Sequence, residues 1–157
     1  MTEAAQVEAE DLQRIKEYAR IVKEFNVAVE LKEGVLEAST RLLSINPEYY
    51  TAWNERKRAI KLEVQISIEF IGEELMFNVA AIKVNPKSYV TWEHRRWFLK
   101  NYCTEPALKA NLVQQELTLL EKLLKLDNRN CKPEIKTISL TMLSFNSSWM
   151  ELSNLAG

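Results

Sequence analysis

An eleven-residue motif occurs twice in this chain at a fixed separation. It reads Asn-Pro-x-x-Tyr-x-x-Trp-x-x-Arg and runs from Asn46 to Arg56 and, 39 positions later, from Asn85 to Arg95. A fixed period of this length is typical of repeat proteins whose unit is a helical hairpin. The motif therefore predicts an all-α protein in which each hairpin packs on its neighbour.

The spacing inside the motif indicates how each helix begins and which face it buries. Asn is expected to cap the helix, and Pro is expected in its first turn, where the missing N–H costs nothing. Tyr and Trp then lie three residues apart on one helical face. Trp53 and Trp92 are therefore predicted to fill equivalent buried positions against the preceding helix.

Apolar residues recur at steps of three and four along most of the chain, as in amphipathic helices. The chain has only 3 Gly and 4 Pro, which favours long helices over many short strands. The pattern predicts about six helices in three antiparallel hairpins over residues 11–126. Helical patterns run over residues 11–31, from Val35 to a stop at Asn46-Pro47, and from Pro47 to a decay around residues 63–67. Further patterns run from Ile68 to a stop at Asn85-Pro86, from Pro86 to near Cys103, and from Pro106 onward.

The repeat pattern ends near residue 130. A third copy begins at Asp127, but Glu134 and Thr137 stand where Trp and Arg are expected, and residues 131–157 contain only 4 charged side chains. Two segments are therefore expected. Residues 1–130 form the helical repeats, and residues 131–157 form a divergent C-terminal tail whose apolar spacing fits one helix.

Charge and composition exclude several functional classes. With 21 Lys+Arg against 22 Asp+Glu, the net charge of −1 argues against nucleic-acid binding through bulk charge. No apolar run approaches the roughly 18 residues of a membrane span, and the acidic N-terminus is unlike a signal peptide. Cys103 and Cys131 lack neighbours at metal-ligand spacing, so no zinc or other metal site is predicted in this chain. A cytoplasmic protein is expected.

The two motifs, and especially the run from Asn85 to Trp97, resemble the repeat of protein prenyltransferase α subunits. Asn54 and the Lys-Ser-Tyr run at Lys87 to Tyr89 are more similar to the α subunit of Rab geranylgeranyltransferase, the type II enzyme, than to the α subunit of farnesyltransferase and the type I enzyme. The resemblance extends over about residues 18–130, whereas family members continue through further repeats. A truncated or alternatively spliced form is therefore expected.

This resemblance implies an architecture and a set of partners. The fold would be a right-handed α/α superhelix, a crescent of hairpins around a separate β subunit that carries the catalytic zinc. The family transfers a geranylgeranyl group from geranylgeranyl diphosphate to C-terminal cysteines of Rab GTPases, which a Rab escort protein presents. This chain would then scaffold the β subunit, would bind no cofactor itself and would be inactive alone.

Two residues are implied to reach the diphosphate, namely Lys87 and Tyr89. The sequence adds a physical argument, because Lys87 is expected in the first helical turn, where the helix dipole disfavours a cation by roughly 0.3–1 kcal/mol. The equivalent residue of the first repeat is Glu48, which carries the favoured charge. A bound anion would turn the cost at Lys87 into a gain. The alternative is that Lys87 is a solvated surface residue.

Basic residues also recur at equivalent places in the two repeats, as Arg56 and Arg58 and then Arg95 and Arg96. They either form solvated faces or pair with an acidic partner surface. His94 is the only histidine, and a packing or surface role is favoured over a catalytic one.

Two non-enzymatic classes remain as alternatives. A tetratricopeptide-like adaptor has a period of about 34 and needs Gly and Ala positions that are absent here. An RNA-processing scaffold built from related half-hairpin repeats is disfavoured by the near-zero net charge.

Overall fold

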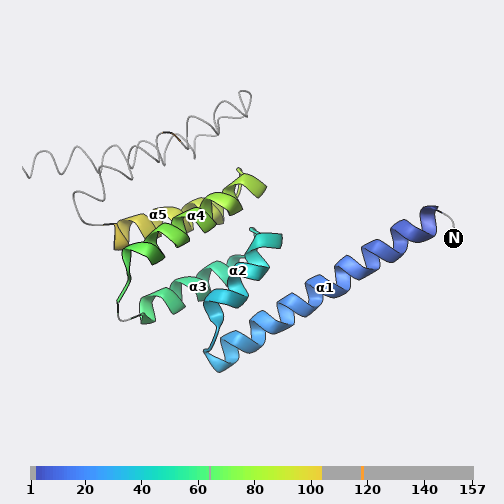
Figure 1. Ribbon diagram of the computed structural model, residues 1–157, viewed down its shortest axis with the longest axis horizontal. Helices are drawn as coiled ribbons and strands as arrows, with labels where there is room; N and C mark the ends of the chain where they lie inside the picture. Colours follow the sequence, from blue (N-terminus) through green and yellow to red (C-terminus); the bar gives the residue numbers. More distant parts are fainter. Residues whose placement is uncertain (1–2, 64, 104–117, 119–157) are drawn as a thin grey trace, which may run out of the picture. The chain divides into compact units, whose positions relative to one another are not determined.

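The computed structural model describes residues 3–63, 65–103 and 118. Within them the chain forms helices and no strands (Figure 1). The helices are α1 (Glu3–Leu31), α2 (Val35–Ile45), α3 (Tyr50–Leu62), α4 (Ile68–Val84) and α5 (Tyr89–Tyr102). The predicted all-α class is confirmed. The sixth predicted helix, the third motif copy and the tail over residues 131–157 lie outside the described residues.

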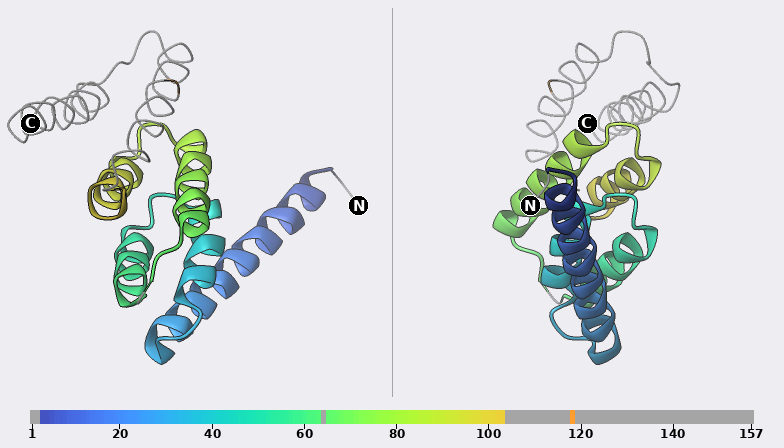
Figure 2. Two further views of the ribbon diagram at one scale, coloured as in Figure 1. Left: turned by 60° about the vertical axis from the view of Figure 1, so that its left-hand side comes forward. Right: turned by 90° about the vertical axis from the view of Figure 1, so that its right-hand side faces the viewer.

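The chain divides into two units, Met1–His94 and Arg95–Gly157, which are treated separately. In the first unit, α2 packs against α1, α3 and α4, and the views of Figure 2 show α2 between α1 and α3. The core cluster of this unit draws on the four helices α1 to α4. Its members are Ile21, Phe25, Leu42, Leu43, Ala52, Trp53 and Ala81.

Helix α1 begins before the predicted start at residue 11, and only its second half contributes to this core. Ile21 and Phe25 are buried, whereas Leu12 and Ile15 of the predicted apolar stripe are exposed. The physical reason is length, because α2 has 11 residues against 29 in α1 and covers only the later turns.

The break between α1 and α2 is a tight helix terminus. Lys32 adopts a left-handed backbone conformation, with φ 55°. The N–H of Lys32 donates to the Val29 carbonyl (3.3 Å), and the N–H of Glu33 donates to the Ala28 carbonyl (3.1 Å). This pair of bonds satisfies the last carbonyls of α1. Gly34 is also left-handed, with φ 65°, and reverses the chain into α2.

The predicted helix-capping role of the motif Asn is wrong. Asn46 and Asn85 end α2 and α4, and their backbone N–H groups donate to the carbonyls of Leu42 (2.9 Å) and Ala81 (3.2 Å). The next helix begins four residues later, at Tyr50 or Tyr89, so the prolines lie in the connecting turns. Asn prefers this place because its side chain can bond the turn backbone, as described below.

Trp53 and Trp92 occupy equivalent buried positions, as predicted. The structure adds their polar anchor, since the indole Nε1–H of Trp53 donates to the Pro47 carbonyl (2.8 Å) and that of Trp92 to the Pro86 carbonyl (2.9 Å). The six-residue spacing from Pro to Trp therefore fastens each turn to the helix that follows it.

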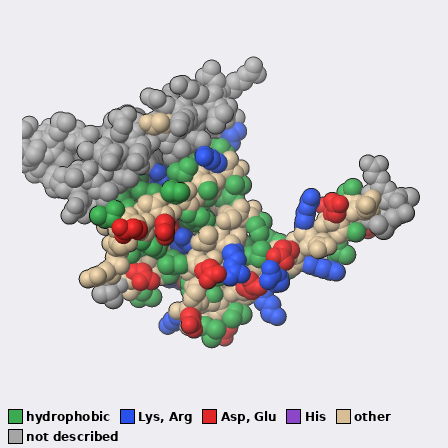
Figure 3. All heavy atoms as spheres, in the orientation of Figure 1, with side chains coloured by type: hydrophobic (Ala, Val, Ile, Leu, Met, Phe, Trp, Pro, Cys, Tyr) green, Lys and Arg blue, Asp and Glu red, His purple; other side chains and the backbone are tan. Residues whose placement is uncertain are grey.

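Acidic and basic side chains alternate along α1 and α2 on the face shown in Figure 3. No helix among the described residues is long and apolar enough to cross a bilayer.

Replacing Trp53 with Phe tests the indole anchor. The variant leaves the Pro47 carbonyl without its indole donor and opens a small void, so the free energy of unfolding should fall by about 2–4 kcal/mol. Urea titration followed by circular dichroism measures the loss. The exposed Tyr50→Phe variant is the control and should change stability by less than about 0.5 kcal/mol. Equal stability of the two variants would contradict a structural role for the indole hydrogen bond.

Candidate functional site

The two residues that the resemblance assigns to the diphosphate lie where the α4–α5 turn meets α5, with Lys87 in the turn and Tyr89 as the first residue of α5. Lys87 and Tyr89 are exposed there. The expected place of Lys87 in the first helical turn is corrected, since α5 begins at Tyr89 and Ser88 precedes it as the capping residue, with its Oγ accepting the Thr91 N–H (3.3 Å). Lys87 thus stands just before the positive end of the helix dipole. Its role at an anion site stays a prediction.

Polar contacts fix this turn on both its N-terminal and its C-terminal side. On its N-terminal side, Asn85 Oδ1 accepts the Lys87 N–H (3.1 Å). On its C-terminal side, the buried Thr91 hydroxyl lies 2.8 Å from Ser88 Oγ and 3.4 Å from the Pro47 carbonyl. The turn is therefore tied to the corresponding turn of the first repeat.

The base of α5 is also held against α4. Asn78, buried on α4, donates from Nδ2 to the Thr91 carbonyl (3.0 Å). A surface turn supported in this way keeps its side chains in place without the ordering cost of a flexible loop.

A buried ion pair joins α3 to α4. Arg56 donates from Nε to Glu74 Oε1 (2.8 Å) and from Nη2 to Glu74 Oε2 (2.5 Å), so the pair is bidentate. Both residues are fully enclosed, with exposed fractions of 5% for Arg56 and 2% for Glu74. Bidentate geometry of this kind is specific to arginine and carboxylate.

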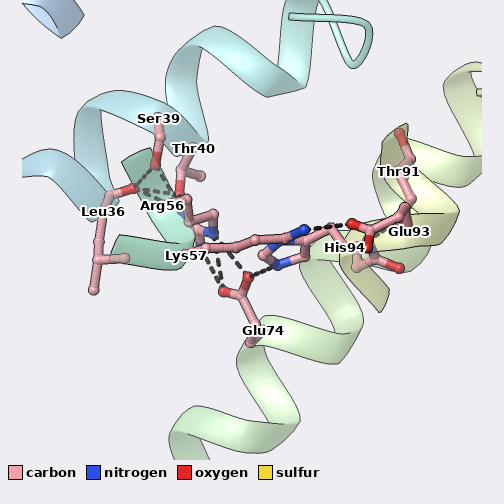
Figure 4. A network of polar contacts seen from close by, with 10 residues as sticks. Leu36, Ser39, Thr40, Arg56, Lys57, Glu74, Thr91, Glu93 and His94 are labelled. Carbon is pink, nitrogen blue, oxygen red and sulfur yellow. Dashed lines mark hydrogen bonds and ion pairs between the residues drawn. The ribbon is translucent and has the colours of Figure 1, made fainter. Parts of the chain in front are cut away.

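The remaining side of the Arg56 guanidinium binds α2. Its Nη1 lies within hydrogen-bond distance of the Leu36 carbonyl (2.8 Å), Thr40 Oγ1 (2.8 Å) and Ser39 Oγ (3.0 Å). The Phe77 ring covers the guanidinium, with Cζ at 4.5 Å from the ring centroid. One arginine thus connects three helices, as Figure 4 shows.

His94 completes the network from α5. Its Nε2 lies 2.8 Å from Glu74 Oε1 (Figure 4). The His94 ring packs on Trp53, with ring centroids 4.5 Å apart. Because an ionised Glu74 can only accept, Nε2 is the protonated nitrogen of a neutral imidazole. The packing role expected for His94 matches this position.

The charge states of the network follow from its partners. Burial raises the pKa of Glu74, but hydrogen bonds from His94 and Arg56, with the charge of Arg56, outweigh burial and hold the pKa at about 2. Burial lowers the pKa of His94, although the bond to Glu74 opposes this. A charged pair and a neutral imidazole therefore share the site at neutral pH.

The four predicted interface arginines divide into two kinds. Arg56 and Arg95 are buried, with exposed fractions of 5% and 4%, whereas Arg58 and Arg96 are exposed. Arg58 pairs with Glu55 on its own helix. Of the two alternatives left open for these arginines, burial excludes the solvated face for Arg56 and Arg95. The partner-interface role of these arginines stays a prediction.

Glu74→Gln tests the ion pair. The substitution keeps the shape of the side chain but leaves the Arg56 charge buried without its counter-ion, so the free energy of unfolding should fall by about 3–5 kcal/mol. Glu37→Gln removes the exposed pair with Arg41 and should cost less than about 1 kcal/mol. Comparable small losses for both variants in urea titrations would contradict the structural role of Glu74.

The lowered pKa of His94 predicts a pH dependence of stability. The unfolded chain takes up a proton below pH 6.5 while the folded His94 resists it, so stability falls as the pH drops below 6.5, by at most about 1.4 kcal/mol per pH unit. Urea titrations between pH 7.5 and 5 measure the slope. His94→Gln, which can still donate to Glu74, should flatten it, because His94 is the sole histidine. An unchanged slope would contradict the assignment.

The described residues define a helical-hairpin repeat protein, in which each repeat carries an Asn-ended helix, a Pro turn and an indole anchored on that turn. Residues 33–62 and 71–102 match the family model described as "Protein prenyltransferase alpha subunit repeat". These two segments are similar to protein prenyltransferase α-subunit repeats, and the resemblance noted in the sequence is confirmed.

Curated relatives agree with this family. The chain is 33% identical over 96 residues to the geranylgeranyl transferase type-2 subunit alpha of Saccharomyces cerevisiae, covering 60% of this chain and 28% of that protein. It is 38% identical over 140 residues to the proteins of the same name from Bos taurus and Sus scrofa, covering 82% of this chain and 24% of each relative. The chain therefore spans about a quarter of the length of these relatives.

Proposed function

We propose that this chain acts as an α subunit in a protein geranylgeranyltransferase of type II, with Lys87 and Tyr89 at the diphosphate site. The observation that carries the proposal is that Lys87, on the α4–α5 turn, and Tyr89, at the start of α5, are both exposed inside the second matched repeat. The family match and the similarity to type-2 α subunits support an α-subunit role.

The chemistry of the proposed reaction explains why a cation belongs on this turn. A cysteine thiolate attacks C1 of the geranylgeranyl diphosphate, the C1–O bond breaks and diphosphate leaves with the bonding electrons. Negative charge grows on the leaving group, and a fixed ammonium beside a helix N-terminus stabilises that charge. A zinc ion, proposed to be bound by the β subunit, would hold the attacking sulfur as thiolate.

Exposed apolar residues support a protein partner at the same end of the hairpins. Tyr50 and Tyr89, with exposed fractions of 63% and 65%, are equivalent in the two repeats, as are the exposed Ile45 and Val84. Their recurrence at equivalent positions of both repeats supports a shared role in binding a partner. We propose that the β subunit binds this surface. We also propose that Arg58 and Arg96 pair with acidic residues of a protein partner. A Rab GTPase with its escort protein is the proposed protein substrate, in the cytoplasm.

A tetratricopeptide-like adaptor without enzymatic partners is the alternative, since the same exposed residues would serve any protein ligand. The repeat family disfavours it. Identification of co-purifying proteins separates the two, because only the first proposal requires a prenyltransferase β subunit among them.

Lys87→Ala tests the diphosphate role in the assembled α/β complex. Loss of the ammonium should lower kcat/KM for prenyl transfer by about 10²–10³ in a dry, preorganised site. Lys83→Ala, which removes an exposed cation from the last turn of α4, is the matched control and should leave turnover unchanged. Steady-state kinetics with varied geranylgeranyl diphosphate measure both effects.

Assembly of each variant is checked by size-exclusion chromatography. Wild-type kinetics for an assembled Lys87→Ala complex would show that Lys87 is a solvated surface residue. Prenyl transfer by this chain without a β subunit would overturn the proposed division of labour.

A further inference from the structure

The side chain of the motif Asn makes two hydrogen bonds in each repeat, one within its own turn and one to the preceding hairpin or helix. In the first repeat, Asn46 Oδ1 accepts the Glu48 N–H (3.1 Å), and Nδ2 donates to the Tyr18 hydroxyl on α1 (2.9 Å). In the second repeat, Asn85 Oδ1 accepts the Lys87 N–H (3.1 Å), and Nδ2 donates to Glu48 Oε1 (3.0 Å).

We propose that Glu48 is a positioning residue for Lys87 and acts through Asn85, an inference that rests on the proposed function. The hydrogen-bond partners of Asn85 fix the orientation of its side-chain amide. A backbone N–H can only donate, so Oδ1 of Asn85 must face Lys87, and Nδ2 must then face an acceptor. Glu48 supplies that acceptor from the first repeat, 37 positions away in the chain.

The hydrogen bond between Glu48 and Asn85 stabilises the N-terminal side of the α4–α5 turn. Ser88 and Thr91 hold the C-terminal side of the turn, and the Asn85 amide holds its N-terminal side at Lys87. Without the Glu48 acceptor, the Asn85 amide is free to rotate toward water, and the Lys87 N–H loses its fixed partner. The ammonium of Lys87 is then presented from a looser backbone.

The charge of Glu48 acts in the opposite direction to its hydrogen bond. A carboxylate next to an anion site weakens binding of the anion, whereas its oxygen orients Asn85. Glu48→Gln keeps an acceptor oxygen and removes the charge, but Glu48→Ala removes both. Because only one exposed hydrogen bond to a positioning residue is lost, Glu48→Ala should lower kcat/KM by about two- to fivefold, whereas Glu48→Gln should not lower it.

Two measurements test the inference on the full chain and on its complex with the β subunit. Nitrogen-15 NMR of the full chain follows hydrogen exchange at the Lys87 backbone amide and the chemical shifts of the Asn85 side-chain amide. Steady-state kinetics of the complex give kcat/KM for geranylgeranyl diphosphate. Glu37→Ala is the control, because it removes an exposed carboxylate from α2 and leaves the contacts from Tyr18 through Asn46 and Glu48 to Asn85 intact.

Faster exchange at Lys87 in Glu48→Ala, with Glu48→Gln and Glu37→Ala like the wild type, is the expected result, together with a fall in kcat/KM for Glu48→Ala alone. Unchanged exchange and Asn85 shifts in Glu48→Ala would overturn the inference. Wild-type kcat/KM in Glu48→Ala, where Lys87→Ala is slow, would also overturn it. If exchange changes as expected but Lys87→Ala turns over normally, the proposed function fails, and the contact remains a structural link between repeats.

Discussion

The bidentate ion pair between Arg56 and Glu74 is the contact on which the arrangement of the first unit depends. A single guanidinium binds a carboxylate of α4 and the Leu36 carbonyl of α2 while it belongs to α3. Taking these charges out of water is costly, and only the full set of partners offsets that cost. The pair therefore favours one relative placement of the three helices, since any other would leave a buried charge unsatisfied. His94 extends the same constraint to the start of α5.

The turns of the two repeats rest on this framework. Each turn is bounded by an Asn that ends one helix and an indole that donates back to the motif proline from the next helix. The second turn also contacts the first. Asn85 donates to Glu48, and the Thr91 hydroxyl lies next to the Pro47 carbonyl. The exposed Lys87 is thus presented by a backbone with contacts on both sides. This support of the backbone is consistent with the anion-binding role proposed above for Lys87.

The fold was predictable where the pattern is local. Steps of three and four place α2 and α4 within a residue of their observed bounds, because helical periodicity is written along the chain itself. The start of α3 was misplaced, since Asn46 and Pro47 carry equally strong signals for a turn and for a helix N-terminus. The exposure of the apolar residues in the first half of α1 was also not predicted, because periodicity does not indicate how much of a helix a neighbouring helix covers.

The sequence by itself determined the helical class, the 39-residue period, the burial of Trp53 and Trp92 and the presence of Lys87 in the second motif. Only the tertiary structure decided which charges are buried. Arg56 and Arg58 look alike in the sequence, yet one meets Glu74 from another helix and the other stays at the surface. The physical reason is that burial of a charge depends on a counter-ion brought by packing. Glu74 is 18 positions from Arg56, and no local pattern links the two.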